Sequence, residues 1–325
     1  MFFRSLRLNA AASATLLDGS RDDIVAGYWA FYPQTNLLTN TLINIRIILM
    51  FKFWKQSRPH TDYKTAKFAV IPVPYEKTTS YGKGTSKGPS AILKASEQVE
   101  DYDIELDRET FRAGINVGRA VRSLDKLSNS VSKVLNDKKI PVVLGGEHSI
   151  TPYAVAACKK KFKDLSVLQL DAHSDLRNSY HGSKNSHACA MRRVLEICPA
   201  VQAGIRSMDI SEMEFAKSSG QISKIHFAEK LEVVEKINSQ LSKDVYITID
   251  IDVLDPSIMP ATGTPEPGGL DYYEVLDILK GVAAQKNIVG FDLVELSPIK
   301  GLNHPDFTAA KLIYKLMGYI SSKPL

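Results

Sequence analysis

The chain has 325 residues, of which 44% are hydrophobic and 24% charged, and its formal net charge is +5 at pH 7. This composition is ordinary for a globular protein and sufficient for one large α/β domain. The lysines are scattered, without a basic stripe interleaved with aromatic residues, so a nucleic-acid partner is excluded. Cys158, Cys189 and Cys198 lack paired spacing, which predicts a reducing compartment and hence a cytoplasmic protein.

The first 65 residues are interpreted as an N-terminal extension of uncertain role. Residues 1–17 contain Arg4 and Arg7 but no acidic residue, a faint similarity to a transit peptide. Residues 37–54 are apolar but are interrupted by polar residues, Arg46 among them. An Arg near the centre of a membrane span costs about 2.5–3.5 kcal/mol, so we expect no span and no membrane partner.

From Phe68 onward, apolar strands alternate with helical segments. Residues 68–73 indicate a buried strand, residues 88–93 open a helix with Ser86 or Ser90 as candidate cap, and residues 124–135 have helical spacing. Further buried strands are predicted at residues 140–144, 167–170, 201–205, 245–249 and 288–296. Such alternation predicts a three-layer α-β-α fold with a mainly parallel sheet.

Three short clusters of acidic residues and histidines stand at the ends of three of these strands. They are Gly-Gly-Glu-His-Ser at residues 145–149, Asp-Ala-His-Ser-Asp at 171–175 and Asp-Ile-Asp-Val-Leu-Asp-Pro at 250–256. Each motif alone is compatible with a turn, but together they lie where open parallel sheets bind ligands. Charged groups at buried strands are usually paired or metal-bound. The candidate metal ligands are His148, Asp171, His173, Asp175, Asp250 and Asp252.

The ligand types narrow the choice of metal. Carboxylates and imidazoles without a thiolate favour Mn²⁺, Fe²⁺ or Zn²⁺, and the excess of carboxylates favours Mn²⁺. Six ligands predict two ions about 3.5–4 Å apart, bridged by carboxylates and a hydroxide. Alternate residues of an extended segment share a side, so Asp171, His173 and Asp175 are expected on one face. The same reasoning predicts a shared face for Asp250 and Asp252.

With these motifs the chain resembles the ureohydrolases, the family of arginase and agmatinase. Gly-Thr-Pro-Glu-Pro-Gly-Gly at residues 263–269 and Glu-Leu-Ser-Pro at residues 295–298 also match, and the resemblance runs from about Ala66 to the C-terminus. It implies an arginase-like fold, a catalytic domain at residues 66–325, and a homo-oligomer, either trimer or hexamer. It also suggests a natural start at Met50, which leaves residues 1–49 without a role in the fold.

The resemblance implies two Mn²⁺ ions per subunit, each with one imidazole and one carboxylate of its own, and two bridging carboxylates. The implied ligands are His148 with Asp175, His173 with Asp252, and Asp171 with Asp250 as bridges.

Three catalytic residues follow from the same resemblance. Asp175 could also orient the bridging hydroxide. His187 matches the proton-shuttling histidine of the family, and a surface-loop histidine is the less favoured alternative. His181 is a nearby rival that lacks the motif context. Glu295 can accept guanidinium hydrogen bonds, or it could be a structural residue that caps a helix or forms a salt bridge. Cys189 is disfavoured as a nucleophile because the metal site already supplies one.

Two positions bear on the guanidino substrate. Arginase-like members tend to carry Asn and Asp where this chain has Arg177 and Ser207, which favours an agmatinase that cleaves agmatine to putrescine and urea. Arg177 could instead receive the carboxylate of guanidinobutyrate. Residues 74–89 resemble the first active-site loop of the family and are expected to shape the far end of the substrate. Arginase, guanidinobutyrase, an aminopropylagmatine ureohydrolase and, less favoured, a non-catalytic relative stay as alternatives.

Overall fold

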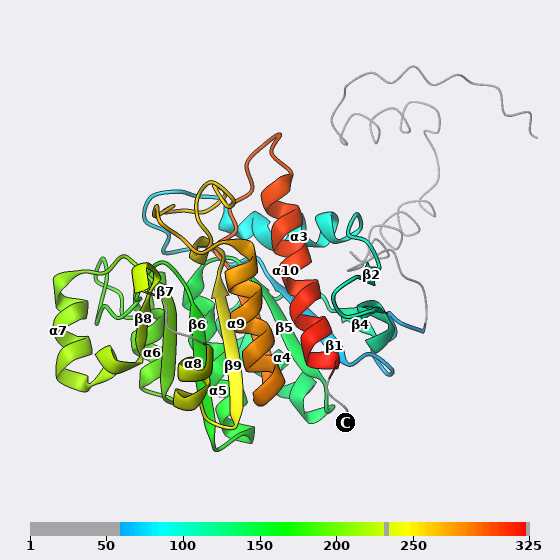
Figure 1. The fold of residues 1–325 in the computed structure, drawn as a ribbon, viewed down its shortest axis with the longest axis horizontal. Coiled ribbons are helices and arrows are strands. Elements are labelled where there is room, and N and C mark those ends of the chain that lie inside the picture. Colours follow the sequence, from blue (N-terminus) through cyan, green and yellow to red (C-terminus); the bar gives the residue numbers. More distant parts are fainter. Residues whose placement is uncertain (1–58, 231–233, 323–325) are drawn as a thin grey trace, which may run out of the picture. The chain divides into compact units, whose positions relative to one another are not determined.

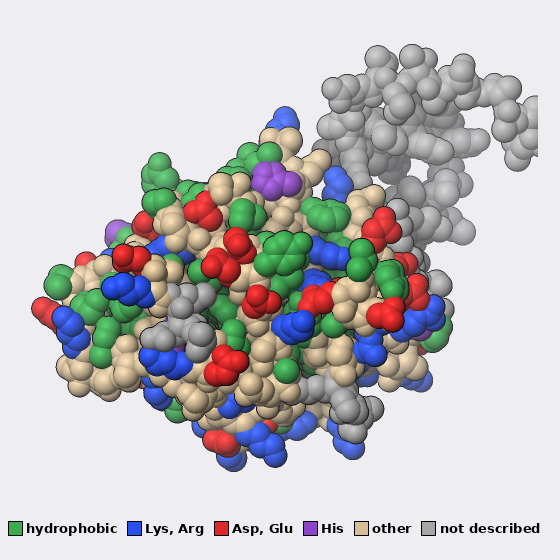
Figure 2. All heavy atoms as spheres, in the orientation of Figure 1, with side chains coloured by type: hydrophobic (Ala, Val, Ile, Leu, Met, Phe, Trp, Pro, Cys, Tyr) green, Lys and Arg blue, Asp and Glu red, His purple; other side chains and the backbone are tan. Residues whose placement is uncertain are grey.

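The computed structural model describes residues 59–230 and 234–322. The expectations for residues 1–49, for a start at Met50 and for residues 37–54 lie outside these ranges and stay predictions. Within the two ranges, no helix combines the length and the apolar character that a membrane crossing requires. Figure 2 shows basic and acidic side chains mixed over the face that it draws, rather than gathered by sign.

One parallel sheet of eight strands organises the fold, in the order β4-β1-β5-β10-β9-β6-β7-β8. Its strands are β1 (Phe68–Val73), β4 (Ile115–Val117), β5 (Ile140–Gly145), β6 (Leu165–Leu170), β7 (Ala200–Ile205), β8 (Ile225–Phe227), β9 (Asp244–Asp250) and β10 (Asn287–Val294). The short strands β2 (Tyr102–Asp103) and β3 (Arg108–Glu109) form a separate antiparallel pair. The last two long strands, β9 and β10, return to the middle of the sheet, between β5 and β6.

Helices cover both faces of the sheet. One face carries α3 (Gly88–Ser96), α8 (Val234–Gln240), α9 (Tyr272–Gln285) and α10 (His304–Ser321), and the other carries α4 (Leu124–Asn136), α5 (Thr151–Lys161), α6 (Ala190–Leu195) and α7 (Ile210–Ser219). In Figure 1, α9 and α10 cross in front of the strands. Alternate strand residues enter opposite cores, Phe68 and Val70 one and Ala69 and Ile71 the other. The strands are therefore apolar on both faces, and the predicted three-layer α/β fold is confirmed.

The predicted elements agree with the observed ones in type, with differences at two ends. The predicted caps of α3 are wrong, because no side chain caps this helix and Pro89 occupies its first turn. Ser86 instead donates a hydrogen bond to Glu76 at 2.7 Å. The strand predicted to reach Leu296 ends at Val294, because Glu295 takes a left-handed backbone conformation (φ 63°) that a strand does not accommodate.

Candidate metal centre and active site

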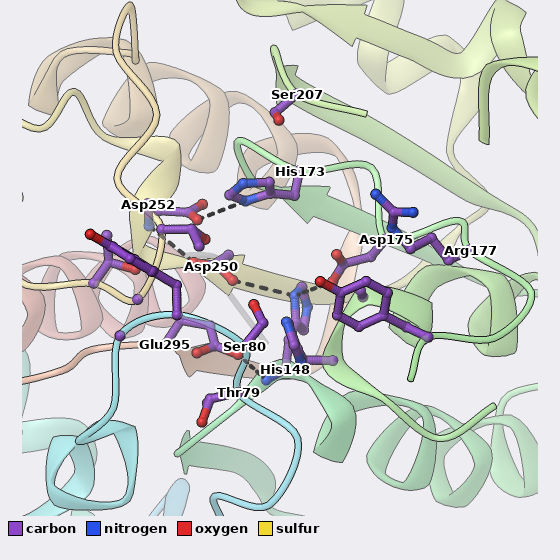
Figure 3. Close-up of a pocket in the computed structure, with 18 of the residues that line it drawn as sticks. Thr79, Ser80, His148, His173, Asp175, Arg177, Ser207, Asp250, Asp252 and Glu295 are labelled. Carbon is purple, nitrogen blue, oxygen red and sulfur yellow. Dashed lines mark hydrogen bonds and ion pairs between the residues drawn. The ribbon is translucent and has the colours of Figure 1, made fainter. Parts of the chain in front are cut away.

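The three ligand motifs lie together because they follow three of the four central strands. The motifs at residues 145–149 and 250–256 begin at the last residues of β5 and β9, and the motif at residues 171–175 follows β6 directly. Glu295 follows β10, which lies between β5 and β9 in the sheet. Parallel strands end at one edge of the sheet, so all four segments meet there. A cavity of about 300 Å³ opens at this edge (Figure 3). Its lining includes His148, His173, Asp175, Asp250, Asp252 and Glu295.

His148 is the centre of the first ligand group. Its Nδ1 atom lies 3.2 Å from Asp171 Oδ2, 3.1 Å from Asp175 Oδ2 and 3.5 Å from Asp250 Oδ2. The ring is almost completely buried, and Nδ1 has no hydrogen-bond partner within the described part of the chain. A buried imidazole nitrogen that lacks a hydrogen bond but faces three carboxylates is suited to binding a cation.

His173 belongs to a second group that shares Asp171 with the first. His173 Nδ1 lies 2.9 Å from Asp252 Oδ2 and 3.8 Å from Asp171 Oδ1. The potential donor atoms of each group lie within 4.8 Å of one another. The groups are His148 with Asp171 and Asp175, and His173 with Asp171 and Asp252. The structure therefore brings all six predicted ligands together, with one oxygen of Asp171 facing each imidazole.

Within the described residues, the four carboxylates of this cluster have ion-pair contacts with its two imidazoles but with no lysine or arginine. Burial and the nearby charge of Asp252 raise the pKa of Asp171 to about 7. Burial, Asp252 and Asp171 together raise the pKa of Asp250 well above its usual value. Carboxyl groups in such a place ionise together only beside added positive charge. The donor types and their burial thus fit two divalent cations better than a structural ion-pair network.

The backbone that presents the ligands differs from the extended geometry expected for Asp250 and Asp252. Asp250 ends β9 and caps the 3₁₀ turn Ile251–Val253, accepting a hydrogen bond from the Asp252 amide at 3.0 Å. The two carboxylates therefore converge through a turn, not through strand alternation. Asp175 (φ 52°) and Glu295 (φ 63°) both adopt the left-handed region that disfavours side chains, as residues at functional sites sometimes do.

Two residues of the sheet, Thr248 and Asp292, orient the ring of His148, and the sequence analysis did not identify them. His148 Nε2 lies 2.9 Å from Thr248 Oγ1, and this hydroxyl donates to Asp292 Oδ1 at 2.5 Å. Because the threonine proton is given to Asp292, its oxygen accepts from Nε2–H, which leaves the lone pair on Nδ1. The sequence offered one indication of this role: Asp292 is a charged residue within the otherwise apolar run 288–296.

His187 lines the cavity, whereas its rival His181 does not. His187 begins a 3₁₀ turn, and its Nδ1 lies 3.3 Å from Thr78 Oγ1. Burial lowers the pKa of its imidazole, although the charge of Asp175 opposes the shift. His181 is exposed and packs against the ring of Tyr180, with 4.2 Å between ring centroids.

Glu295 also lies in the cavity wall. Its Oε1 atom accepts a hydrogen bond from the backbone N–H of His148 at 2.6 Å, which fixes the carboxylate beside the first ligand group. Burial raises the pKa of Glu295 to about 8, although the hydrogen bond from His148 opposes the shift. A cationic group beside this carboxylate would favour its ionised form.

The cavity wall includes two carboxylates, Asp209 and Glu212, that the sequence analysis missed, and a third, Glu266, contacts the lining residue Ser207. Arg177 Nη1 lies 3.4 Å from Asp209 Oδ2, and its Nε lies 3.7 Å from Glu212 Oε2. Ser207 donates a hydrogen bond to Glu266 Oε1 at 3.0 Å. The residues involved are 32 to 59 positions apart in the sequence. Their pairing therefore carries no local signal beyond the residue types themselves.

A parallel α/β fold with clustered carboxylates and imidazoles at the strand ends defines a site of the kind that metal-dependent hydrolases use. The chain belongs to the arginase family, whose family model matches residues 66–318.

The chain is also similar to several known proteins over most of their length. The N(1)-aminopropylagmatine ureohydrolase of Synechocystis sp. is 37% identical over 288 residues, 82% of this chain and 94% of the relative. The agmatinase of Bacillus subtilis is 36% identical over 287 residues, 83% of this chain and 97% of the relative. The crystal structure of the agmatine ureohydrolase of Thermoplasma volcanium superimposes with a TM-score of 0.74 at 31% identity, covering 86% of this chain and 98% of that one.

Proposed function

We propose that this protein is an agmatinase-type ureohydrolase that hydrolyses the guanidinium group of agmatine to urea and putrescine. The observation that carries the proposal is the pair of ligand groups that share Asp171, at the floor of a cavity that also contains Glu295. Membership of the arginase family supports a hydrolase acting on guanidino compounds, and relatives named agmatinase support the substrate class.

The six clustered side chains would hold two Mn²⁺ ions. One ion would be bound by His148 and Asp175, the other by His173 and Asp252, with Asp171 and Asp250 shared between them. The excess of carboxylates over imidazoles is the reason for preferring Mn²⁺. When bound, such a pair of ions lowers the pKa of a shared water and supplies hydroxide at neutral pH.

Three further roles follow from where the side chains lie. The buried carboxylate of Glu295 would accept hydrogen bonds from the substrate guanidinium and hold its central carbon above the ligand groups. Asp175 would orient the nucleophile. His187, kept neutral by its burial, would take a proton and deliver it to the departing amine.

The outer cavity favours a cationic substrate end. Arg177 faces both Asp209 and Glu212, so its charge is already compensated and does not offer a free clamp for a carboxylate. Glu266 adds a further negative charge beside Ser207. Guanidinobutyrate and arginine would each bring a carboxylate into this acidic surrounding, whereas agmatine brings an ammonium.

N(1)-aminopropylagmatine is the second candidate substrate. Three relatives that are 37 to 40% identical carry the name of its ureohydrolase. Its additional ammonium group would also match the surplus carboxylates of the outer cavity.

Urea release from a panel of guanidines tests the proposal. Agmatine, N(1)-aminopropylagmatine, arginine and 4-guanidinobutyrate are compared by kcat/KM with added Mn²⁺. We expect agmatine or its aminopropyl derivative to exceed the other two compounds by orders of magnitude. Faster hydrolysis of arginine or guanidinobutyrate would refute the agmatinase assignment, and no urea from any guanidine would refute the ureohydrolase.

A further inference from the structure

We propose that Thr78 and Glu147 form a positioning relay for His187, which fixes the ring so that Nδ1 keeps its proton and Nε2 serves the cavity. This inference rests on the proposed function of His187. It adds two residues that lie outside the ligand groups and do not touch the reacting atoms.

Glu147 is the buried end of the relay. Its side chain is fully buried, and its Oε2 atom accepts the backbone N–H groups of Lys77 at 2.5 Å and Thr78 at 2.6 Å. Its Oε1 atom accepts the hydroxyls of Thr78 at 2.8 Å and Ser149 at 2.5 Å. Four donors converge on this one carboxylate, so it acts as an acceptor throughout.

Close backbone approach makes this contact feasible. The Glu147 amide donates to Tyr75 O at 2.9 Å, and a Cβ atom at Gly146 would lie only 2.0 Å from the same oxygen. Glycine at this position therefore lets residues 75–78 run directly against residues 146–147. The first cavity loop is thereby tied to the ligand motif of β5.

The direction of the hydrogen bonds follows from the single proton of the Thr78 hydroxyl. That proton is given to Glu147, so Thr78 Oγ1 accepts from its other neighbours. These neighbours are the backbone N–H of His187 at 3.0 Å and His187 Nδ1 at 3.3 Å. Ser186 Oγ also lies 3.3 Å from Nδ1, but a hydroxyl without a committed proton can donate or accept and does not select a tautomer.

The relay affects catalysis through the fraction of molecules in which the His187 ring has the tautomer and orientation needed for proton transfer. An imidazole with its proton on Nδ1 presents Nε2 to the cavity as the atom that takes and returns a proton. Without the Thr78 hydroxyl, the ring would populate the other tautomer and other orientations. The acid–base group itself supplies about 10²–10⁴-fold. Loss of a supporting hydrogen bond should cost less, up to about tenfold.

Thr78→Val isolates the hydroxyl. The variant keeps both backbone N–H bonds to Glu147, so the loop stays attached. We expect kcat for agmatine to fall by up to about tenfold with KM and metal content unchanged, and Thr78→Ser to restore kcat. Ser149→Ala is the matched control, because it removes another hydroxyl donor from Glu147 without reaching His187 and should keep kcat.

A double-variant cycle and a spectroscopic measurement separate this role from a merely structural one. In a His187→Asn background, Thr78→Val should cause no further loss, because its effect passes through the ring. In the wild-type protein loaded with diamagnetic Zn²⁺, ¹⁵N NMR of labelled histidines should show the His187 proton on Nδ1, with the signal assigned from His187→Asn.

The failures are distinguishable. A proton on Nε2, full activity of Thr78→Val, or an equal loss in the His187→Asn background would each overturn the relay while leaving the ureohydrolase assignment intact. Failure of the wild-type protein to release urea from any guanidine would instead refute the proposed function. The NMR measurement needs no folded variant of Thr78, so the relay stays testable if Thr78→Val does not fold.

Discussion

The imidazoles of His148 and His187 are oriented by the same arrangement of hydrogen bonds in two different parts of the fold. In each case a threonine hydroxyl contacts the ring and gives its own proton to a buried carboxylate. The supports are Thr248 with Asp292 for His148, and Thr78 with Glu147 for His187. Opposite ring nitrogens are held, Nε2 in His148 and Nδ1 in His187, so opposite nitrogens are presented to the cavity.

The two supports differ in what carries them. Thr248 and Asp292 are paired neighbours in β9 and β10, in the middle of the sheet, and both are fully buried. Thr78 lies on a loop that also supplies Ser80 and Tyr81 to the cavity wall. A ligand fixed by the sheet suits a metal, which needs constant geometry. The proposed shuttle, in contrast, is held by a loop that lines the cavity, where the backbone is not part of the sheet.

The largest expected effect comes from removing the carboxylate that both ligand groups share. Asp171→Ala should lose most of both metal equivalents, because Asp171 faces both imidazoles. Its activity should fall further than the about 10²–10⁴-fold expected for loss of an acid–base group. Plasma mass spectrometry of the purified variant measures the metal. Two full equivalents of metal with normal turnover would contradict the assignment of Asp171 as a shared ligand. The contrast between a metal-binding His148 and a proton-transferring His187 would then lose its basis.

Variants of His187 and His148 should differ in which property they lose, turnover or metal. His187→Asn should lower kcat for agmatine by about 10²–10⁴-fold with little change in KM and a normal metal content. His148→Asn should lose metal instead. His181→Asn is the matched control, since His181 is exposed and does not line the cavity. A loss of turnover in His181→Asn but not in His187→Asn would exchange their roles.

The sheet support makes a smaller prediction about affinity. Thr248→Val should weaken metal binding by about 10- to 100-fold, as loss of a partner of a metal-ligating histidine commonly does. Thr151→Val serves as the control, because Thr151 donates to the same Asp292 at 2.9 Å without a hydrogen bond to His148. Titration calorimetry with Mn²⁺ measures both variants, and Thr248→Ser should bind normally. Equal weakening by Thr151→Val would place the effect in Asp292 or in the 3.3 Å contact between the Thr151 and Thr248 hydroxyls, not in the His148 contact alone.

The sequence predicts the central strands and the ligand motifs well because both are local signals. Strands buried on both faces require continuous apolar runs, and β1, β5, β6 and β9 have them. The short edge strands β4 and β8 have three residues each, too few for a recognisable pattern. His187 and Glu295 were found only through the family resemblance, because neither position is distinctive in composition.

The supports and the outer carboxylates were beyond the sequence for a different reason. Thr78 and Glu147 are 69 positions apart, and Thr248 and Asp292 are 44 apart. A threonine that orients a histidine ring has no distinctive sequence pattern, because its role depends only on where the fold places its hydroxyl. Arg177 shows the same limit, because its sequence position left a carboxylate clamp open until Asp209 and Glu212 were seen beside it.

The smallest expected effect is at Glu266, which contacts the cavity-lining Ser207 and belongs to neither threonine support. Glu266→Gln removes a charge but keeps an amide oxygen that can accept the hydrogen bond of Ser207. Glu266 is partly exposed, so its attraction for a substrate ammonium is screened and worth about 0.2–1 kcal/mol.

KM for agmatine should therefore rise by about 1.4- to 5-fold, which is that free energy expressed as a binding ratio, with kcat unchanged. The rise should shrink at high salt, since the interaction is between screened charges. Metal content is the necessary control, because Glu266 Oε1 also lies 4.0 Å from His173 Nε2. A fall in kcat with intact metal would mean that Glu266 acts on the reacting centre. Recognition of the substrate end would then not be separable from the catalytic roles of His148 and His187.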